Sequence, residues 1–174
     1  MYFSSVAAME NYLKRIKKAA SLQKNGWVLL LEDDVWVWAS IKQNDLRYDV
    51  TGTCRHQFSA ECSKCPAAIQ MHSPHREVFR NASCYGAYGG HYLNSSRILG
   101  LKDYQGLLRD LLSAVGGPVA SDILLSAVIL SDGGSIGDNM GFYEPNDLAQ
   151  VFLNAKYDPP NIFHQMKYLY SKKV

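Results

Sequence analysis

A short, continuously apolar segment over residues 27–31 runs directly into an acidic triplet, Glu32, Asp33 and Asp34. An apolar run of this length is typical of a strand buried on both faces of a parallel sheet. The residues ahead of it predict a helix over 4–23, because apolar side chains recur there at three- and four-residue steps: Val6, Met9, Leu13, Ile16 and Ala20. A helix that leads into a buried strand indicates an α/β fold.

The second half of the chain also has a regular pattern. A glycine-rich segment over 83–93 predicts a strand, and helices are predicted over 94–99, 103–115 and 121–130. Each helix begins at a residue suited to an N-cap, namely Asn94, Asp103 and Ser121. The run of glycine, serine and aspartate over 131–138 predicts a loop.

The composition favours one domain over residues 1–174, because 47% of the chain is hydrophobic and single domains commonly hold about 100–200 residues. With 18 Lys and Arg against 16 Asp and Glu, the net charge is +2, which gives little support to a nucleic-acid surface. We expect the one basic run to be a solvated helix face: Lys14, Arg15, Lys17 and Lys18.

The sequence shows no apolar stretch of about 18 residues, so no membrane span is predicted. Its first residues also lack the pattern of a signal peptide. Sequons at Asn81 and Asn94 would fit the lumen of the secretory pathway, although such triplets occur by chance in cytosolic proteins. A cytoplasmic and a lumenal location both stay open.

The cysteines lie in a Cys/His-rich segment predicted as a loop over 52–84. Cys62 and Cys65 have a spacing found in zinc sites, and Cys54 or Cys84 could complete the set of ligands. Disulfides in an oxidising lumen and free thiols are the alternatives. Each of these states would make the segment structural.

The acidic triplet carries most of the functional information. Two carboxylates held about 4 Å apart repel by about 4 kcal/mol at an effective dielectric constant near 20, so three in succession favour a bound cation. Carboxylate oxygens suit Mg²⁺ or Mn²⁺. In an extended segment Glu32 and Asp34 share one side, and Trp36 would lie on that side too, either stacking on a sugar ring or packing in the core.

The triplet after an apolar strand resembles the Asp-X-Asp type motif of the metal-dependent GT-A fold glycosyltransferases. The resemblance implies a mixed, Rossmann-like sheet flanked by helices, and a Mn²⁺ or Mg²⁺ ion that bridges the protein and the diphosphate of a nucleotide sugar. It implies that Asp34 is the main metal ligand, that Glu32 is a further one, and that Asp33 contacts the donor sugar.

Three later segments are similar to elements of the same family in the same order. The glycine-rich segment around Gly89 and Gly90 resembles the strand beside the donor sugar, where glycines allow a close backbone approach. Asp122 matches the carboxylate at a helix start that inverting members use as a base, although it could also merely stabilise the helix dipole. His164 resembles the C-terminal histidine that completes the metal site, which would favour manganese.

The resemblance implies an enzyme that moves a sugar from a nucleoside diphosphate donor to a hydroxyl of a glycan, protein or lipid. The family carries further strands and the nucleotide-base pocket ahead of the acidic motif, where this sequence offers one helix. Three explanations stay open: 1–174 is the C-terminal part of a larger domain, the base site is reduced, or a partner chain supplies it. An exposed edge at the 27–31 strand would be a sign of that.

Two other functions are compatible with the same residues. One is a non-catalytic module that binds carbohydrate or a partner and contains a structural zinc loop. The other is a hydrolase that uses Asp33, Asp34 and Asp122 around Mg²⁺.

Overall fold

The computed structural model describes residues 1–31, 36–37, 46–56, 85–138, 142–143 and 162–163. Four helices are present among them: α1 (Val6–Leu22), α4 (Ser95–Gly100), α5 (Gln105–Val115) and α6 (Ser121–Ser131). The main sheet has four strands in the order β2 (Trp27–Leu30), β5 (Tyr85–Asn94), β4 (Val50–His56) and β7 (Ile136–Asp138). The described part of the chain is thus a mixed α/β structure.

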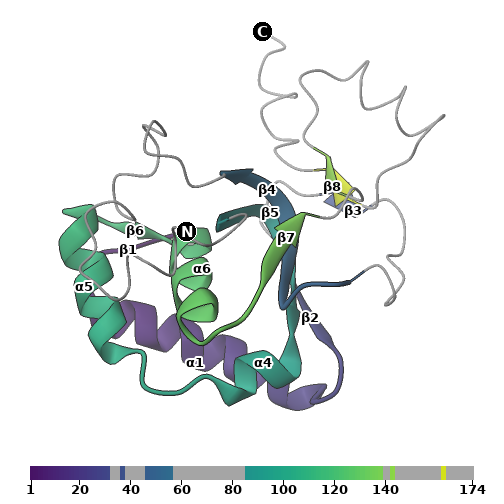
Figure 1. Ribbon diagram of the computed structural model, residues 1–174, viewed down its shortest axis with the longest axis horizontal. Coiled ribbons are helices and arrows are strands. Elements are labelled where there is room, and N and C mark those ends of the chain that lie inside the picture. The colour runs from purple at the N-terminus through teal and green to yellow at the C-terminus, as the bar shows by residue number, and fades with distance from the viewer. Residues whose placement is uncertain (32–35, 38–45, 57–84, 139–141, 144–161, 164–174) are drawn as a thin grey trace, which may run out of the picture.

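Two smaller sheets accompany the main one. β1 (Tyr2–Phe3) pairs with β6 (Val119–Ala120), and β3 (Trp36–Val37) and β8 (Phe142–Tyr143) lie on either side of β9 (Ile162–Phe163). The main sheet is mixed, because β5 is antiparallel to both β2 and β4 while β7 is parallel to β4. In Figure 1 the helices lie to one side of the main sheet.

The amphipathic pattern of the first segment produces α1 as predicted. Ser5 caps the helix, its hydroxyl accepting a 3.2 Å hydrogen bond from the Ala8 amide. Four of the five predicted apolar positions are buried and Val6 packs partly buried against the core. The basic residues of α1 are exposed except Lys17, which is half-buried and donates a 2.6 Å hydrogen bond to the Leu101 carbonyl.

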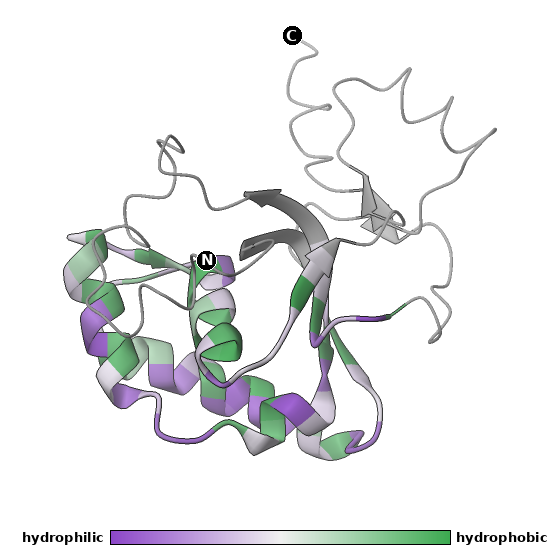
Figure 2. Ribbon diagram, viewed as in Figure 1, coloured by the Kyte–Doolittle hydropathy of each residue, from purple (hydrophilic) through white to green (hydrophobic). Residues whose placement is uncertain are grey.

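The helix α6 is the central element of the core. Its residues Leu124, Leu125 and Ile129 are at most 1% exposed, and the visible side of α6 in Figure 2 is mostly hydrophobic, whereas α1 carries both hydrophilic and hydrophobic residues. α6 packs more extensively against β5 than against any other element. Leu93 of β5 is fully buried in the same hydrophobic core cluster.

The prediction of a strand buried on both faces of a parallel sheet was wrong for β2. All four of its residues are half-buried, its partner β5 is antiparallel, and β2 forms an edge of the main sheet among the described strands. Val28 and Leu30 pack against the core. A short apolar run does not reveal how many neighbours a strand has, so sequence patterning could not separate an edge strand from a central one.

Several predicted boundaries also need correction. Asn94 caps α4 as expected, accepting a hydrogen bond from the Arg97 amide. The N-caps of α5 and α6 are instead Tyr104 and Ala120, neither of which makes a side-chain cap bond. Asp103 has a left-handed φ of 37°, which removes it from a capping geometry.

Two predicted loops are partly strands. Residues 136–138 form β7, and 52–56, including Cys54, belong to β4 rather than to a Cys/His-rich loop. Cys54 pairs with Ala87 of β5. In both segments, pairing with a neighbouring strand supplies the backbone hydrogen bonds, a tertiary effect that local composition does not encode.

One end of the main sheet is joined by a network of four polar residues, which we call the Arg97 network: Arg97, Asp49, Asp132 and Ser135. Arg97 Nη1 donates hydrogen bonds to the backbone oxygen and Oδ2 of Asp132, both at 3.1 Å, and Arg97 Nε lies 3.5 Å from Asp49 Oδ2. The same Asp49 oxygen accepts from the Ser135 amide at 2.9 Å and its hydroxyl at 3.1 Å. The network therefore links α4, the C-terminal end of α6, and the starts of β4 and β7.

Within the described residues, no helix is both long enough and apolar enough to cross a membrane.

Candidate functional site

The acidic triplet Glu32, Asp33 and Asp34 lies outside the described residues, and so does His164. The described residues nearest to these positions are Leu31, just before the triplet, Trp36, two residues after Asp34, and Phe163, just before His164. β2 ends at Leu30, and Leu31, which directly precedes the triplet, is 51% exposed. The core-facing strand thus ends where the predicted site begins.

The pairing of β3 with β9 joins the two segments predicted to bind a metal. Trp36 is the Cα partner of Phe163 in an antiparallel ladder, and Val37 is the partner of Ile162. In the sequence, Asp34 precedes Trp36 by two residues and His164 directly follows Phe163. Residues more than 120 positions apart are therefore paired within two residues of Asp34 and of His164. Trp36, a predicted sugar contact, is part of this ladder.

The predicted glycine pair lies in an irregularity of β5. Thr51 of β4 pairs with Tyr92, and Thr53 pairs with Tyr88, so one residue of β4 faces three of β5: Gly89, Gly90 and His91. Such a bulge bends the strand and leaves backbone groups outside the regular ladder, and bulges are common beside active sites. On its other side, His91 pairs with Leu30, the last residue of β2. The bulge and the end of β2 are therefore neighbours.

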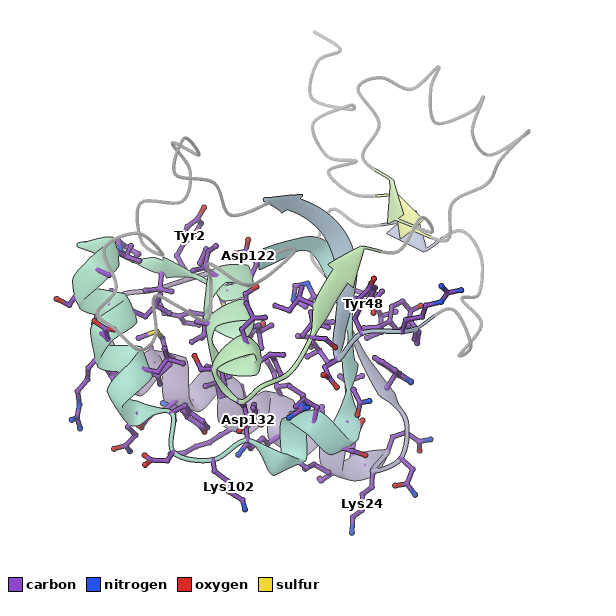
Figure 3. The ribbon with its side chains drawn as sticks, in the orientation of Figure 1. Tyr2, Lys24, Tyr48, Lys102, Asp122 and Asp132 are labelled. Atoms are coloured by element: carbon purple, nitrogen blue, oxygen red, sulfur yellow. The ribbon has the colours of Figure 1, made fainter. Side chains whose placement is uncertain are left out.

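Asp122 lies in the first turn of α6 and is 6% exposed. The preceding amide, that of Ser121, donates a 2.9 Å hydrogen bond to the Met1 carbonyl, because β1 pairs with β6 immediately before the helix. Figure 3 shows Asp122 at one end of α6 and Asp132 at the other, with exposed Tyr2 near Asp122. Its position at a helix start is confirmed, and it fits both a base and a dipole-stabilising carboxylate.

The height of Asp122 along the sheet follows from the Arg97 network. That network fixes Asp132 next to the end of β5, where the Asn94 amide donates to the Asp49 carbonyl. Asp122 is ten residues earlier in α6, which corresponds to about 15 Å of helix. α6 lies alongside β5 in Figure 1, and 15 Å along a strand is about four to five residues, which reaches from Asn94 back to Gly90 and Gly89. For a helix and a strand that run side by side, these rises correspond to a height of Asp122 near that of Gly89 and Gly90.

Two further buried polar residues, one on α6 and one on β5, were not singled out from the sequence. Ser126 follows Asp122 by four residues, which places both on one face of α6, and it is 1% exposed. His91 belongs to the bulge and is 3% exposed. The alternation of β5 could have indicated His91, since it shares a strand face with the buried Leu93.

A separate groove of about 320 Å³ lies between α1 and the start of α5. It is lined by groups of both signs, including Glu10, Lys14 and Asp103. Lys17 Nζ lies 5.3 Å from the Tyr104 ring centre, and burial, with a smaller contribution from the Glu10 charge, raises the pKa of Tyr104. The mixed charge of the groove does not favour a single class of ligand.

Among the described residues, no three His, Cys, Asp or Glu side chains are grouped closely enough to hold a metal ion. Both predicted metal sites consist largely of residues outside that set, namely the triplet with His164, and Cys62, Cys65 and Cys84 with Cys54. The carboxylates and imidazole of the first set are donors that Mn²⁺ accepts.

Comparisons of the sequence with models of known protein families and with curated proteins give no match.

Proposed function

We propose that this protein is a metal-dependent glycosyltransferase of GT-A type, which transfers a sugar from a nucleoside diphosphate donor to a hydroxyl acceptor. The observation that carries the proposal is the β3–β9 ladder, which joins the chain just after Asp34 to the chain just before His164. This ladder supports the proposal because it pairs two short segments that are far apart in the sequence and that flank two of the three predicted metal ligands.

Mn²⁺ or Mg²⁺ would be held by Asp34, with Glu32 and His164 as further ligands. The bound cation supplies charge neutralisation at the departing diphosphate. Asp33 and Trp36 would contact the donor sugar, and the bulge at Gly89 and Gly90 would let the backbone approach it closely.

Asp122 would act as the base. As the acceptor oxygen attacks the anomeric carbon, the bond from that carbon to the diphosphate oxygen breaks and the hydroxyl proton passes to the Asp122 carboxylate. The support is positional, because Asp122 lies in the first turn of α6, α6 packs against β5, and β5 pairs with the last residue of β2.

The nucleotide base requires surface beyond the described residues. Among the described strands, β2 lies at an edge of its sheet and is half-buried, and the next residue, Leu31, is apolar and exposed. Unpaired strand edges readily accept a further strand. A base-binding part, in the same polypeptide or in a partner chain, would extend the sheet from β2.

The test is calorimetric titration of the full chain with nucleoside diphosphates, with and without Mn²⁺. We expect Mn²⁺-dependent binding that weakens at least about tenfold in Asp34→Ala and in His164→Ala, since each removes a ligand. Asp103→Asn is the matched control, because it removes an exposed carboxylate at a left-handed residue where asparagine is equally tolerated.

The outcomes separate the candidate functions. Nucleotide binding that ignores Mn²⁺ and Asp34 would sink the enzyme proposal and favour the binding module. The protein is then incubated with a panel of nucleotide sugars, and the release of nucleoside diphosphate is measured with and without acceptor. Release that requires an acceptor supports transfer, whereas equal release without one indicates a hydrolase.

A further inference from the structure

One face of α1 is cationic and fully open to solvent. Four side chains lie along it at spacings that place them on one side of a helix, and all four are exposed: Lys14, Arg15, Lys18 and Leu22. The opposite side of α1 is buried in the hydrophobic core. At 1.5 Å per residue, the stripe extends about 12 Å along the helix axis. We call these four residues the α1 outer face.

The positive charge of the α1 outer face is not neutralised by its surroundings. Among the described residues, no carboxylate forms an ion pair with its three cations. Glu10, the one acidic residue of α1, is half-buried and lines the groove beside α5 instead. Because salt screens exposed charges over about 8–10 Å, acidic residues elsewhere on the molecule do not cancel this local excess. A chain with a net charge of only +2 thus has one strongly cationic face.

Two more lysines extend this surface beyond the helix. Lys24 follows α1, and its carbonyl accepts a 3.0 Å hydrogen bond from the Ser96 hydroxyl of α4. Lys102 follows Leu101, whose carbonyl accepts the hydrogen bond from Lys17 of α1. Both Lys24 and Lys102 are exposed. The cationic surface therefore continues from α1 onto the segment that lies beside it.

The exposed Leu22 distinguishes between the anionic surfaces that could bind here. It is 84% exposed, at the end of the cationic stripe. An aliphatic side chain beside cations suits the boundary between lipid headgroups and acyl chains, where its burial is favourable. A nucleic acid would instead be bound by aromatic side chains on which its bases stack. The exposed aromatic residues of the described part, Tyr2 and Tyr48, belong to β1 and to the segment before β4.

We propose that the α1 outer face, together with Lys24 and Lys102, docks this protein peripherally onto an anionic phospholipid bilayer. The cations approach the lipid headgroups and Leu22 enters the interface. Each Lys or Arg close to such a surface strengthens binding about fivefold, and burial of a leucine adds about tenfold. The apolar side of α1 stays packed on the core throughout. The inference goes beyond the proposed transferase activity and does not depend on it.

Docking on this surface sets the orientation of the molecule on the bilayer. Figure 3 shows Lys24 and Lys102 on the opposite side of the molecule from Asp122. The N-terminal end of α6 therefore points away from the lipid and into the aqueous phase.

The first experiment measures sedimentation of the full chain with vesicles, in the absence of nucleotide and metal. The vesicles contain phosphatidylcholine alone or phosphatidylcholine with phosphatidylserine. We expect binding to require phosphatidylserine, to weaken as salt is added, and to fall about 25-fold when Lys14→Gln and Lys18→Gln are combined. The matched control combines Arg47→Gln with Arg109→Gln, which removes two exposed cations outside the surface and should leave the affinity unchanged.

The second experiment separates a bilayer from other polyanions. Leu22→Gln keeps the length of the side chain and all charges, and the exposure of this position means that the fold is preserved. It should weaken binding to phosphatidylserine vesicles about tenfold. Any binding of duplex DNA, which offers phosphates without acyl chains, should be the same in Leu22→Gln and in the wild type.

Three results would overturn the proposal. One is no binding to phosphatidylserine vesicles at low ionic strength, and another is equal affinity of the two double variants. The third is DNA binding at least as tight as vesicle binding, with Leu22→Gln changing neither, which would assign the surface to a nucleic acid. If the double variant does not fold, Lys18→Gln alone should still weaken vesicle binding about fivefold. No readout uses transfer activity, so failure of the transferase proposal would leave these results unaffected.

Discussion

The two ends of α6 handle charge in opposite ways. At the C-terminal end, the Arg97 network holds its charges half-exposed, with side-chain exposures of 31% for Arg97, 29% for Asp132 and 19% for Asp49. At the N-terminal end, Asp122 is almost fully buried. The two ends are labelled by Asp132 and Asp122 in Figure 3.

The difference indicates separate roles. Partly exposed ion pairs stabilise a fold only modestly, and their desolvation cost is small. The structural role of the Arg97 network, which links four elements, is enough to explain these pairs. A buried carboxylate is costly and is a poor way to stabilise a helix, because hydrophobic side chains of similar size do so at least as well. Such a group is a candidate for function. We therefore expect substitutions at the N-terminal end of α6 to change activity and substitutions at its C-terminal end to change stability.

The largest effect is expected for Asp122→Asn, which keeps the shape of the side chain but removes the base. Transfer should fall about 10²–10⁴-fold, the usual contribution of a general base. The measurement is the initial rate of nucleoside diphosphate release in the presence of acceptor. Asp132→Asn, the corresponding change at the other end of α6, should leave the rate per folded molecule unchanged. Equal losses in both variants would mean that the ends do not differ in role.

Asp49→Ala should cause the largest loss of stability at the C-terminal end. It removes the acceptor for both Ser135 donors and the partner of Arg97, and we expect the free energy of unfolding to fall by about 2–3 kcal/mol. Urea denaturation followed by circular dichroism measures this. Ser135→Ala should lower the free energy of unfolding by less, because the backbone amide of residue 135 can still donate to Asp49. No change in the urea midpoint would show that the network is dispensable.

A close backbone approach at the same end predicts a loss for Gly134→Ala. A Cβ atom there would lie 2.6 Å from Ile129 Cγ2 and 2.9 Å from the Ile129 backbone oxygen, which already accepts the Gly134 amide. We expect a cost of about 1–2 kcal/mol from this overpacking. Gly106→Ala in α5 is the matched control, since nothing lies within 4 Å of its new methyl group, and it should stabilise by about 0.5–1 kcal/mol. Thermal melts that move in the same direction for both would contradict this.

The smallest effect is expected at alkaline pH, where carboxylates and arginine keep their charges and neither end of α6 changes. Burial raises the pKa of Tyr92 and of Tyr104 above the ordinary value of 10.0. The unfolded chain therefore loses these protons first, so their contribution is complete below about pH 10 and is lost as the pH rises through the folded pKa values. Urea midpoints measured from about pH 9 to 11 should fall, and less steeply in Tyr92→Phe.

The helices were the most predictable part of the fold. The burial of Met9, Leu13, Ile16 and Ala20 follows from a period of 3.6 residues, which a single segment carries by itself. The type of sheet was not predictable in this way. Whether β2 is central or at an edge, and parallel or antiparallel, depends on β5, which lies more than 50 residues away.

The site was predictable only in its chemistry. Types of residue and their order in the chain identified Asp122 as a carboxylate at a helix start, and the structure confirms that position. The burial of Ser126 could not be predicted from local sequence, because it depends on how α6 packs against β5. The roles of Glu32, Asp33, Asp34 and His164 stay predictions.

The hydrogen bond from the Ser121 amide to the Met1 carbonyl has a consequence for protein engineering. β1 pairs with β6 immediately before α6. Any residues that precede Met1, whether natural sequence or a purification tag, therefore start close to the helix turn that carries Asp122. A bulky fusion at that point would stand over the proposed reaction centre. Assays should therefore compare the tagged protein with the same protein after the tag has been cleaved.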